Sequence, residues 1–339
     1  MSRRVTKLQQ KGLNAFFEYA RNRHLCYIMK YAEPSWVVPD PILRDYSFCN
    51  IFRELDKTTK WLADNVRGPM NKARDPNLML AVVLFRMFNR IETGEAMFRD
   101  DNLLGDYSSF HEYCETGKTS VLRRAIVNRL GKKGPYVTGS YIIAGPGGMS
   151  KLDGMLKVVD QFRREQALFD LNDVVTEPMG VKQMSHYMTG HKVSLQNAHA
   201  WFRQFQFFGT FHSYEIVTDL RHTHLLSRAP DIYTWASPGP GCRRGLNRVM
   251  GRDKDERSWA NIEELLNEMD ILIEESQLGY QWTKFAHDCL DKYPKLKTPL
   301  EWEMRDVEHT LCEFDKYCRT ASGEGRPRGK YRGHEAARK

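Results

Sequence analysis

A glycine-rich turn stands directly before the residues of this sequence that are best suited to hold a phosphate group. Gly239-Pro240-Gly241 precedes the basic pair Arg243 and Arg244, in a stretch typical of the start of a helix. The first N–H groups of a helix are unpaired and its dipole favours anions, and guanidinium groups bind phosphate oxygens bidentately. The pattern predicts an anion site. The neighbouring residues assigned to the same substrate site are Asp231, Trp235, Asn247 and Arg248.

A second glycine turn lies at residues 208–211 (FGTF), between an aromatic-rich stretch and a stretch that ends at His222. A glycine there allows backbone N–H groups to approach a phosphate, and the next helix adds a favourable dipole. Helix, glycine hairpin and helix in succession suit DNA. The residues predicted to contact the DNA backbone are Gly209, Thr210, Gly239 and Gly241.

Acidic residues and a histidine follow the hairpin at helical spacing. Glu215, Asp219 and His222 are four and three residues apart, so they share one face of a helix. A carboxylate and an imidazole on one face are suited to general acid–base catalysis, which is the role predicted for them. The alternative is ordinary ion pairing, with His222 capping the end of the helix.

Two further stretches, residues 50–56 and 86–92, place charged residues among apolar ones. Buried charges must be paired or face a polar cleft. The sequence therefore leaves two alternatives open: an internal Arg–Glu network that braces two helices, or a cleft that holds substrate. The substrate-binding candidates under the second alternative are Asn50, Arg53, Glu54, Asn89, Arg90 and Glu92.

Two apparent motifs carry little weight. Gly117-Lys118-Thr119 resembles the end of a phosphate-binding loop, but such a loop needs a glycine five positions earlier, where Glu112 stands. A helix start before Val121 explains the stretch better. The seven cysteines are scattered and odd in number, without a CxxC pair, so no zinc or iron–sulfur site and no metal ligands are predicted.

Helical periodicity predicts the elements that must position these residues. Apolar residues recur at three- and four-residue steps over 43–65, 77–91, 120–130, 155–168, 194–208 and 262–276. Residues 136–143 alternate weakly like a strand, although they could equally start a helix. The fold class predicted is all-α. The glycines of residues 131–148 mark a long loop, either the rim of a site or a hinge between two helical lobes around a cleft.

Size and charge set the domain organisation and the class of partner. The chain has 339 residues, 41% of them hydrophobic, and a net charge of +8. We expect one helical domain over residues 1–318 and a basic disordered tail over 319–339, which either adds phosphate affinity or only keeps the chain in solution. The excess charge favours nucleic acid as a partner. With no signal peptide or long apolar run, we expect a cytoplasmic protein without membrane contact, in the host cell if phage-encoded.

Six stretches, in order, resemble one known family over residues 44–319: FCNIFRELD (48–56), FRMFNRIET (85–93), FGTF (208–211), EIVTDLRHT (215–223), GPGCRRGLNR (239–248) and VEHTLCEFDKY (307–317). The sequence is similar to the alpha-glutamyl/putrescinyl thymine pyrophosphorylases, also described as amino acid:DNA transferases. These are related to the helical domain of 5-hydroxymethyl-dU DNA kinases. We call these stretches the six family stretches.

The resemblance implies a helix-hairpin-helix DNA glycosylase-like fold and a role in DNA hypermodification in bacteriophages. In that reaction, an amine or amino acid displaces pyrophosphate from pyrophosphorylated 5-hydroxymethyluracil in double-stranded DNA. The kinases of the family carry a P-loop domain, and this sequence shows none, which favours the transferase branch. A separate DNA base kinase is then an expected partner.

The implied mechanism begins with flipping of the modified base out of the DNA. Arg243 and Arg244 would hold the departing pyrophosphate, and Asp219, Glu215 or His222 would take a proton from the incoming amine. Arg53, Arg90 and Asn89 would bind an amino acid carboxylate. No cofactor is predicted, although a magnesium ion is compatible with bound pyrophosphate.

Two rival functions follow from the same residues. A DNA base glycosylase would use a catalytic carboxylate about twenty residues after the hairpin glycine, where Asp231 lies. A non-catalytic DNA-binding partner of the kinase would bind DNA with a steep salt dependence and turn nothing over.

Overall fold

The computed structural model describes residues 7–99, 108–138, 145–168, 178–278 and 282–324. Within this part the chain is predominantly helical, and its strands are one short antiparallel pair, so the all-α prediction is confirmed at this level. The chain divides into two compact units. Unit 1 combines residues 1–56 with 232–339, and unit 2 comprises residues 57–231. The cleft expected between two lobes stays a prediction.

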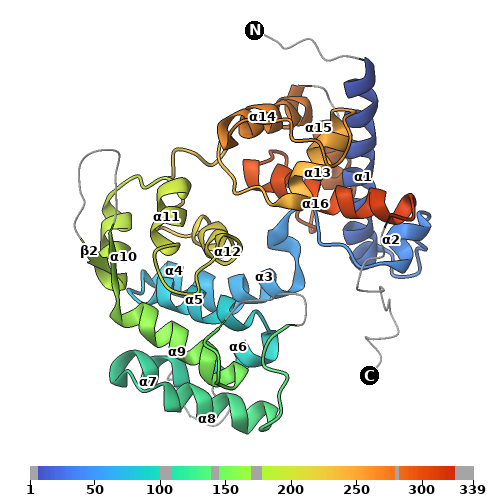
Figure 1. The fold of residues 1–339 in the computed structure, drawn as a ribbon. Helices are drawn as coiled ribbons and strands as arrows, with labels where there is room; N and C mark the ends of the chain where they lie inside the picture. Colours follow the sequence, from blue (N-terminus) through green and yellow to red (C-terminus); the bar gives the residue numbers. More distant parts are fainter. Residues whose placement is uncertain (1–6, 100–107, 139–144, 169–177, 279–281, 325–339) are drawn as a thin grey trace. The chain divides into compact units, whose positions relative to one another are not determined.

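Unit 1 unites the two ends of the chain. Its elements are α1 (Lys7–Ala32), α2 (Pro41–Asp45), the 3₁₀ turn η1 (Arg53–Leu55), α13 (Pro240–Val249), α14 (Ile262–Leu278), α15 (Thr283–Lys292) and α16 (Met304–Ala321) (Figure 1). The core is aromatic: Trp302 packs against Phe16, Phe17, Phe52 and Trp282, with ring centroids 5.3–6.0 Å apart. Edge-to-face packing of this kind adds to the hydrophobic contribution of the buried rings.

Helices α13 and α16 cross at very short range, because glycines face the crossing. A Cβ atom added at Gly245 would stand 2.1 Å from the carbonyl oxygen of Leu311, and one at Gly241 would stand 2.5 Å from the Cys312 Sγ. Any side chain at Gly245 would therefore push the two backbones apart. Gly241 and Gly245 thus serve helix packing, and α16 is held firmly against α13 (Figure 1).

Unit 2 consists of α3 (Lys57–Leu62), the π-helical turn η2 (Ala63–Arg67), α4 (Gly68–Ala73), α5 (Leu78–Phe88), α6 (Ile91–Phe98), α7 (Ser109–Thr116), α8 (Thr119–Leu130), α9 (Lys151–Arg164), β1 (Gln166–Leu168), β2 (Pro178–Gly180), α10 (Val181–Gly190), α11 (Leu195–Phe202) and α12 (Thr210–Leu220). All eleven residues of α5 are buried, which explains why its sequence is apolar on every side. Its neighbour α12 is buried from His212 onward. These two helices form the centre of unit 2 (Figure 1).

The π-helical turn η2 has a local cause in the sequence. Pro69 has no N–H, and its ring would clash with the carbonyl of Asn65 in a regular α-helix. The turn widens instead, so that the Gly68 N–H donates to the carbonyl of Ala63, five residues back. As a result, Arg67 points inward and is only 4% exposed.

Several predicted elements differ from the structure. Residues 43–65 are not one helix: they hold the end of α2, a loop, η1, α3 and the start of η2. The helix predicted over 155–168 ends at Arg164, and residues 166–168 pair with 178–180 as β1 and β2. The helix predicted over 194–208 ends at Phe202. Of residues 136–143, where a strand or the start of a helix was expected, residues 136–138 form neither, and residues 139–143 lie outside the described part.

The ends of the predicted regions shift as well. Helix α16 continues to Ala321, three residues into the predicted tail, and residues 325–339 lie outside the described part. Helix α8 begins at Thr119, directly after Gly117 ends α7 in the left-handed conformation, so the helix start predicted there is confirmed. None of the helices within the described ranges is both long and apolar enough to cross a membrane.

Candidate functional site

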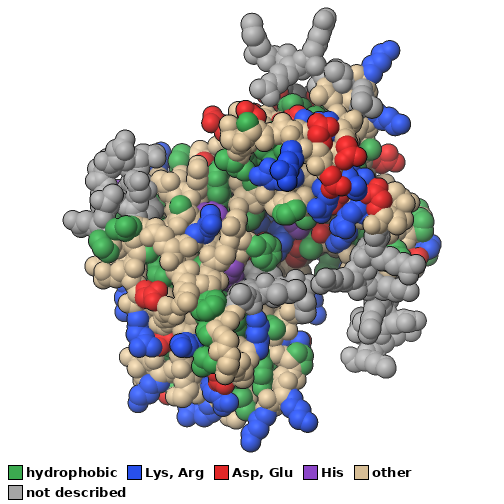
Figure 2. Space-filling model, viewed as in Figure 1, with side chains coloured by type: hydrophobic (Ala, Val, Ile, Leu, Met, Phe, Trp, Pro, Cys, Tyr) green, Lys and Arg blue, Asp and Glu red, His purple; other side chains and the backbone are tan. Residues whose placement is uncertain are grey.

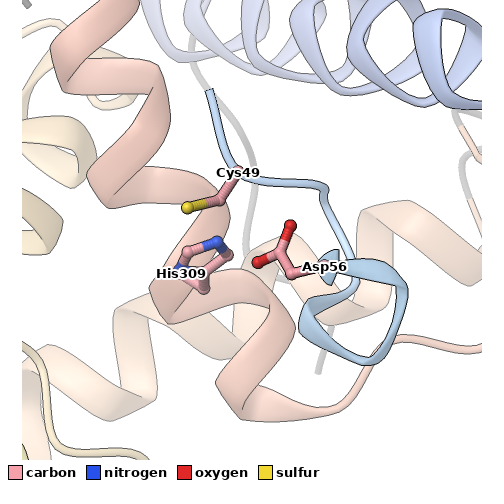
Figure 3. A group of neighbouring side chains, drawn as sticks. All are labelled: Cys49, Asp56 and His309. Carbon is pink, nitrogen blue, oxygen red and sulfur yellow. The ribbon is translucent and has the colours of Figure 1, made fainter. Parts of the chain in front are cut away.

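A cluster of three metal-ligand-type side chains lies in unit 1, and we call it the Cys49 cluster: Cys49, Asp56 and His309. Cys49 and Asp56 belong to one segment, and His309 is on α16 (Figure 3). The segment is folded back on itself by Asn50, whose amide Nδ2 donates to the carbonyl of Leu55 and to Asp56 Oδ1, both at 3.0 Å. The sequence predicted Asn50 as a substrate ligand; in the structure it shapes the loop.

Helix α16 supplies a second polar contact to this segment. Glu313 is one helical turn after His309, and its Oε2 accepts a hydrogen bond from the Cys49 backbone N–H at 2.9 Å. The same carboxylate forms an ion pair with Lys316, whose Nζ lies 2.6 Å from Glu313 Oε2. The family stretches 48–56 and 307–317, about 250 residues apart in the chain, are therefore in direct contact.

Burial controls the ionisation of the Cys49 cluster. Desolvation, followed by the cations Arg53, Arg305 and Lys316, lowers the pKa of His309 well below its usual value. Burial raises the pKa of the Cys49 thiol well above its usual value, and it also raises the pKa of Asp56 against the opposing effect of Arg53. At neutral pH the imidazole is neutral and the thiol protonated.

Arg53 and Glu54 do not lie on an α-helix, as their spacing had predicted, but in η1. Arg53 Nε lies 3.6 Å from Asp56 Oδ2, and Glu54 Oε1 lies 3.9 Å from Arg305 Nη2. Both are half-buried ion pairs inside unit 1, which corresponds to the bracing network that the sequence had left open.

A different side of α16 carries the predicted anion site. Asp315 is fully buried, and it accepts hydrogen bonds from the Nε atoms of Arg244, Arg248 and Arg319 at 2.9, 3.0 and 3.1 Å. The three arginine side chains are 29%, 17% and 36% exposed. Arg248 also pairs with Glu324 at 2.8 Å. We call this group the Asp315 cluster.

The Asp315 cluster is not fully neutralised. Three guanidinium groups face two carboxylates, and Arg243, half-buried one residue away, pairs with no carboxylate among the described residues. Arg244 contacts Asp315 through Nε, which leaves its terminal nitrogens available. The cluster retains positive charge that an anion could satisfy.

The turn before α13 differs in part from the prediction. Gly239 is the N-cap of α13 in an extended conformation, and nothing lies within 4 Å of a Cβ added there, so its surroundings are open. Gly241, predicted as a DNA contact, faces Cys312 instead. The missing side chain makes room for a helix, and the DNA contact of the Gly241 backbone stays a prediction.

Three other predicted site residues have structural contacts. Asn247 is buried; its amide donates to the carbonyls of Lys254 and Glu256 and holds the loop after α13. Trp235 is buried in unit 1. Asp231, the carboxylate of the glycosylase alternative, accepts hydrogen bonds from the N–H groups of Leu195 and Gln196 at 2.7 and 3.0 Å. Both of its oxygens therefore cap the start of α11.

Unit 2 contains a second buried charge group, the Asp219 cluster: Arg67, Arg86, Glu215 and Asp219. Arg86 Nε and Nη2 donate to the two oxygens of Asp219 at 2.5 and 2.9 Å, and Arg67 Nη1 donates to Oδ1 at 3.1 Å. Glu215 lies 3.9 Å from Arg86. Two cations and two anions balance, and every member is less than 9% exposed.

This balance bears on the predicted catalytic residues. Both oxygens of Asp219 accept hydrogen bonds from arginines, and the catalytic role expected of Asp219 stays a prediction. His222 is half-buried in the turn after α12, where its backbone N–H donates to the Asp219 carbonyl. Asn89 ends α5 in the left-handed conformation and accepts from Arg86 at 2.8 Å. Arg90 pairs with the half-exposed Glu92 at 3.1 Å.

The predicted hairpin is a longer connection than expected. The chain turns over residues 203–209, and Phe207, not Gly209, adopts the left-handed conformation, with φ 68°. Gly209 is an extended N-cap of α12. Gly209, Thr210 and Phe211 are exposed, so the start of this eleven-residue helix faces solvent. The DNA contact predicted for Gly209 and Thr210 stays a prediction.

Basic side chains on α8 and the turns at its ends form a second exposed surface of unit 2 (Figure 2). Its three arginines are partly neutralised: Arg123 pairs with Asp153 at 2.7 Å, Arg124 with Glu112 at 3.5 Å and Arg129 with Glu95 at 2.6 Å. The exposed cations here are Lys118, Arg123, Arg124, Arg129, Lys132 and Lys133.

The structure brings together residues that sequence reasoning missed. Cys49, Asp56 and His309 were not assigned to any site, since no two of them form a local ligand motif. The available signal was that all three belong to the six family stretches, of which 48–56, 239–248 and 307–317 lie in unit 1 and the others in unit 2.

Comparison with known proteins supports the family resemblance. Residues 10–326 match the family model for the helical domain of 5-hmdU DNA kinase. A 5-hmdU DNA kinase of Bacillus phage SP10 is 24% identical over 294 residues, which cover 82% of this chain and 40% of the relative. The chain thus spans less than half the length of that protein. No solved structure matches, so the glycosylase-like fold and the pyrophosphorylase branch stay predictions. Since the family model matches nearly the whole described chain, the protein belongs to the family of 5-hmdU DNA kinase helical domains.

Proposed function

We propose that this protein modifies thymine-derived bases in phage DNA, and that it exchanges the pyrophosphate of pyrophosphorylated 5-hydroxymethyluracil for an amine or amino acid. The observation that carries the proposal is the family match over residues 10–326. Thymine modification follows from the named relative, the kinase of phage SP10. The choice of the pyrophosphate-releasing reaction rests on the six family stretches.

The proposed step is a substitution at the 5-methylene carbon. The amine nitrogen forms a bond to that carbon while the carbon–oxygen bond to pyrophosphate breaks, and its electron pair leaves with the pyrophosphate. The amine nitrogen then gives up one proton. We expect a flipped base, since the carbon then meets the second substrate in a closed pocket.

The Asp315 cluster and Arg243 are the groups we assign to the leaving pyrophosphate. They combine residual positive charge, partial exposure and the N-terminus of the ten-residue helix α13. Donors fixed where negative charge develops accelerate such a step by stabilising the leaving group. Asp315 keeps Arg244 oriented before substrate arrives, which lowers the cost of ordering the side chain.

DNA binding is assigned to the exposed start of α12, at Gly209 and Thr210, and to the basic surface around α8. A helix N-terminus binds phosphate through its free N–H groups. The exposed lysines and arginines add an attraction that does not depend on sequence.

A second function is favoured by one observation: the matching relative is a kinase, and this chain covers 40% of it. The helical domain could serve to present the base in DNA to a kinase active site. In that case the protein would bind DNA and raise the rate of a kinase without releasing pyrophosphate itself.

The deciding experiment is nucleoside mass spectrometry after incubation of the protein with duplex DNA that contains pyrophosphorylated 5-hydroxymethyluracil, together with a mixture of amino acids and polyamines. The proposal expects release of pyrophosphate and a nucleoside whose mass is that of thymidine plus an amine substituent. DNA with ordinary thymine is the substrate control.

The other outcomes separate the alternatives. Abasic sites would identify a glycosylase and return attention to Asp231. Unchanged DNA in spite of tight binding, combined with faster phosphorylation of 5-hydroxymethyluracil DNA by an added kinase, would establish the kinase-partner function and refute the transferase.

A further inference from the structure

The side chains of the Cys49 cluster approach one another closely enough to share an ion. The ligand atoms of Cys49, Asp56 and His309 all lie within 4.8 Å of one another (Figure 3). Three such atoms always have a common point within about 2.8 Å, which is 4.8 Å divided by √3. Zinc–ligand distances are about 2.0–2.3 Å. Inward movements of less than about 1 Å, within the reach of small rotations of the side chains, would complete the site.

His309 supplies an independent sign of a missing ligand. It is 9% exposed, and its Nε2 is buried with no hydrogen-bond partner among the described residues. A buried imidazole nitrogen with a free lone pair is the group that a histidine offers to zinc. A buried nitrogen acceptor without a partner is otherwise unfavourable.

The other two side chains are oriented by neighbouring groups. Asp56 Oδ1 accepts hydrogen bonds from the backbone N–H of Asn50 at 2.8 Å and from the Asn50 side-chain amide at 3.0 Å. The other oxygen, Oδ2, lies 3.6 Å from Arg53 Nε. The Cys49 backbone is fixed by Glu313. Such outer contacts fix the direction of ligand side chains and are a regular part of metal sites.

We propose that Cys49, Asp56 and His309 bind a zinc ion with a fourth coordination position open. Thiolate, imidazole and carboxylate together suit zinc, whereas magnesium and calcium take oxygen ligands. Three protein ligands and one exchangeable position are typical of catalytic zinc, and structural zinc has four protein ligands. The site is distinct from the magnesium considered for pyrophosphate.

Charge balance fits this ion. The thiol of Cys49 loses its proton to solvent when the sulfur–zinc bond forms, so the thiolate and the Asp56 carboxylate offset the two charges of zinc. The cations Arg53, Arg305 and Lys316 that surround His309 oppose a metal without this compensation, and the anions Glu313 and Glu54 lie beside them. We expect about one proton released per zinc, because ligands must be deprotonated to bind.

The test is metal analysis of the full-length protein purified without chelators, followed by replacement of zinc with cobalt(II). We expect one zinc per chain and, with cobalt, a thiolate-to-cobalt charge-transfer band in the near ultraviolet. This band reports sulfur ligation in the unaltered protein, so the result does not depend on any variant folding. A metal-free protein that takes up neither zinc nor cobalt would overturn the proposal.

Variants then locate the site. Cys49→Ser should remove the charge-transfer band and His309→Gln should lower zinc affinity by more than about 100-fold, since loss of a ligand costs at least as much as loss of an outer contact. Cys312→Ser, a half-buried thiol on the same helix, is the matched control and should keep the band. Metal retained by Cys49→Ser and His309→Gln would show adventitious binding elsewhere and refute the site.

The open position connects the metal to the chemistry, and this step alone rests on the proposed function. Inorganic pyrophosphate added to the cobalt protein should shift its visible absorption if a phosphate oxygen takes the fourth position. Cobalt binding without such a shift would leave the metal site in place and refute its contact with the leaving group. Neither measurement uses DNA or turnover, so failure of the transferase reaction would not affect it.

Discussion

Asp219 in unit 2 and Asp315 in unit 1 are both buried carboxylates held by arginines, yet their surroundings differ. Asp219 is paired with arginines that are themselves 2% and 5% exposed, and Glu215 completes a neutral group. The arginines on Asp315 are 17–36% exposed and outnumber their carboxylates. The same kind of ion pair, aspartate with arginine, is therefore part of the buried core in unit 2 and presents positive charge to solvent in unit 1. Burial of the cation, rather than that of the anion, distinguishes the two.

The largest effect expected from this difference is on stability. Asp219→Ala leaves Arg67 and Arg86 buried without their main partner and should cost about 3–5 kcal/mol of unfolding free energy. Asp315→Ala should cost only about 1–3 kcal/mol, because its arginines can turn toward water. Urea unfolding at neutral pH measures both. Equal losses would show that exposure of the arginines does not distinguish the two clusters.

A second prediction tests what the exposed arginines do. Arg243→Ala combined with Arg244→Ala should lower turnover about 100- to 1,000-fold, the usual effect of removing a donor to a developing anion, while DNA affinity is largely kept. Turnover is followed by pyrophosphate release. Arg257→Ala, which removes an exposed arginine of the same unit, is the control. Turnover at the wild-type level in the double variant would refute the assignment.

A third prediction compares the units through their buried histidines. Desolvation lowers the pKa of His24 in unit 1 and of His212 in unit 2 to about 3, from 6.5. Both are neutral when folded, so the unfolded chain binds more protons below pH 6.5 and stability is lost as the pH falls from there. At pH 5 each histidine should lower the free energy of unfolding by about 2 kcal/mol relative to its value well above pH 6.5.

His24→Asn and His212→Asn should each flatten the pH dependence of the urea midpoint between pH 6.5 and 5 by a similar amount. A slope unchanged by His212→Asn would mean that this histidine is not buried neutral, and that unit 2 is more open than the structure shows.

The smallest effect concerns DNA. Gly209→Asp adds a carboxylate at the exposed start of α12 and should weaken DNA binding about 10-fold, or about 1.4 kcal/mol, at moderate salt. Aspartate is a good N-cap, so the helix should be kept. Gly190→Asp, at an exposed glycine with equal free space, carries the same charge change. If both variants weaken DNA binding equally, the effect comes from the net charge of the protein, and the start of α12 does not contact DNA.

Much of the fold was predictable from local pattern, and the sites were not. The apolar run of α5 and the periodicity of α8 and α14 specify helices by themselves. The stretch 43–65 has similar periodicity, but Asn50 and Asp56 satisfy its backbone as a loop, so the local pattern failed there. Asp231 and Gly241 were assigned from residue type, whereas their partners, α11 and Cys312, are distant in the chain. Contacts across such separations leave no local signal.

Helix α16 contributes a residue to each of the two clusters described in unit 1, the Cys49 cluster and the Asp315 cluster. His309 and Asp315 are six residues apart, which places them about 120° apart around the helix axis. The position of the helix is set where Gly245 meets the carbonyl of Leu311. A movement of α16 cannot change one cluster alone. Any shift that moves Asp315 relative to the arginines of α13 also moves His309 relative to Cys49. The positions of the two clusters are therefore coupled through α16, and a change confined to one cluster has to come from the side chains around the helix.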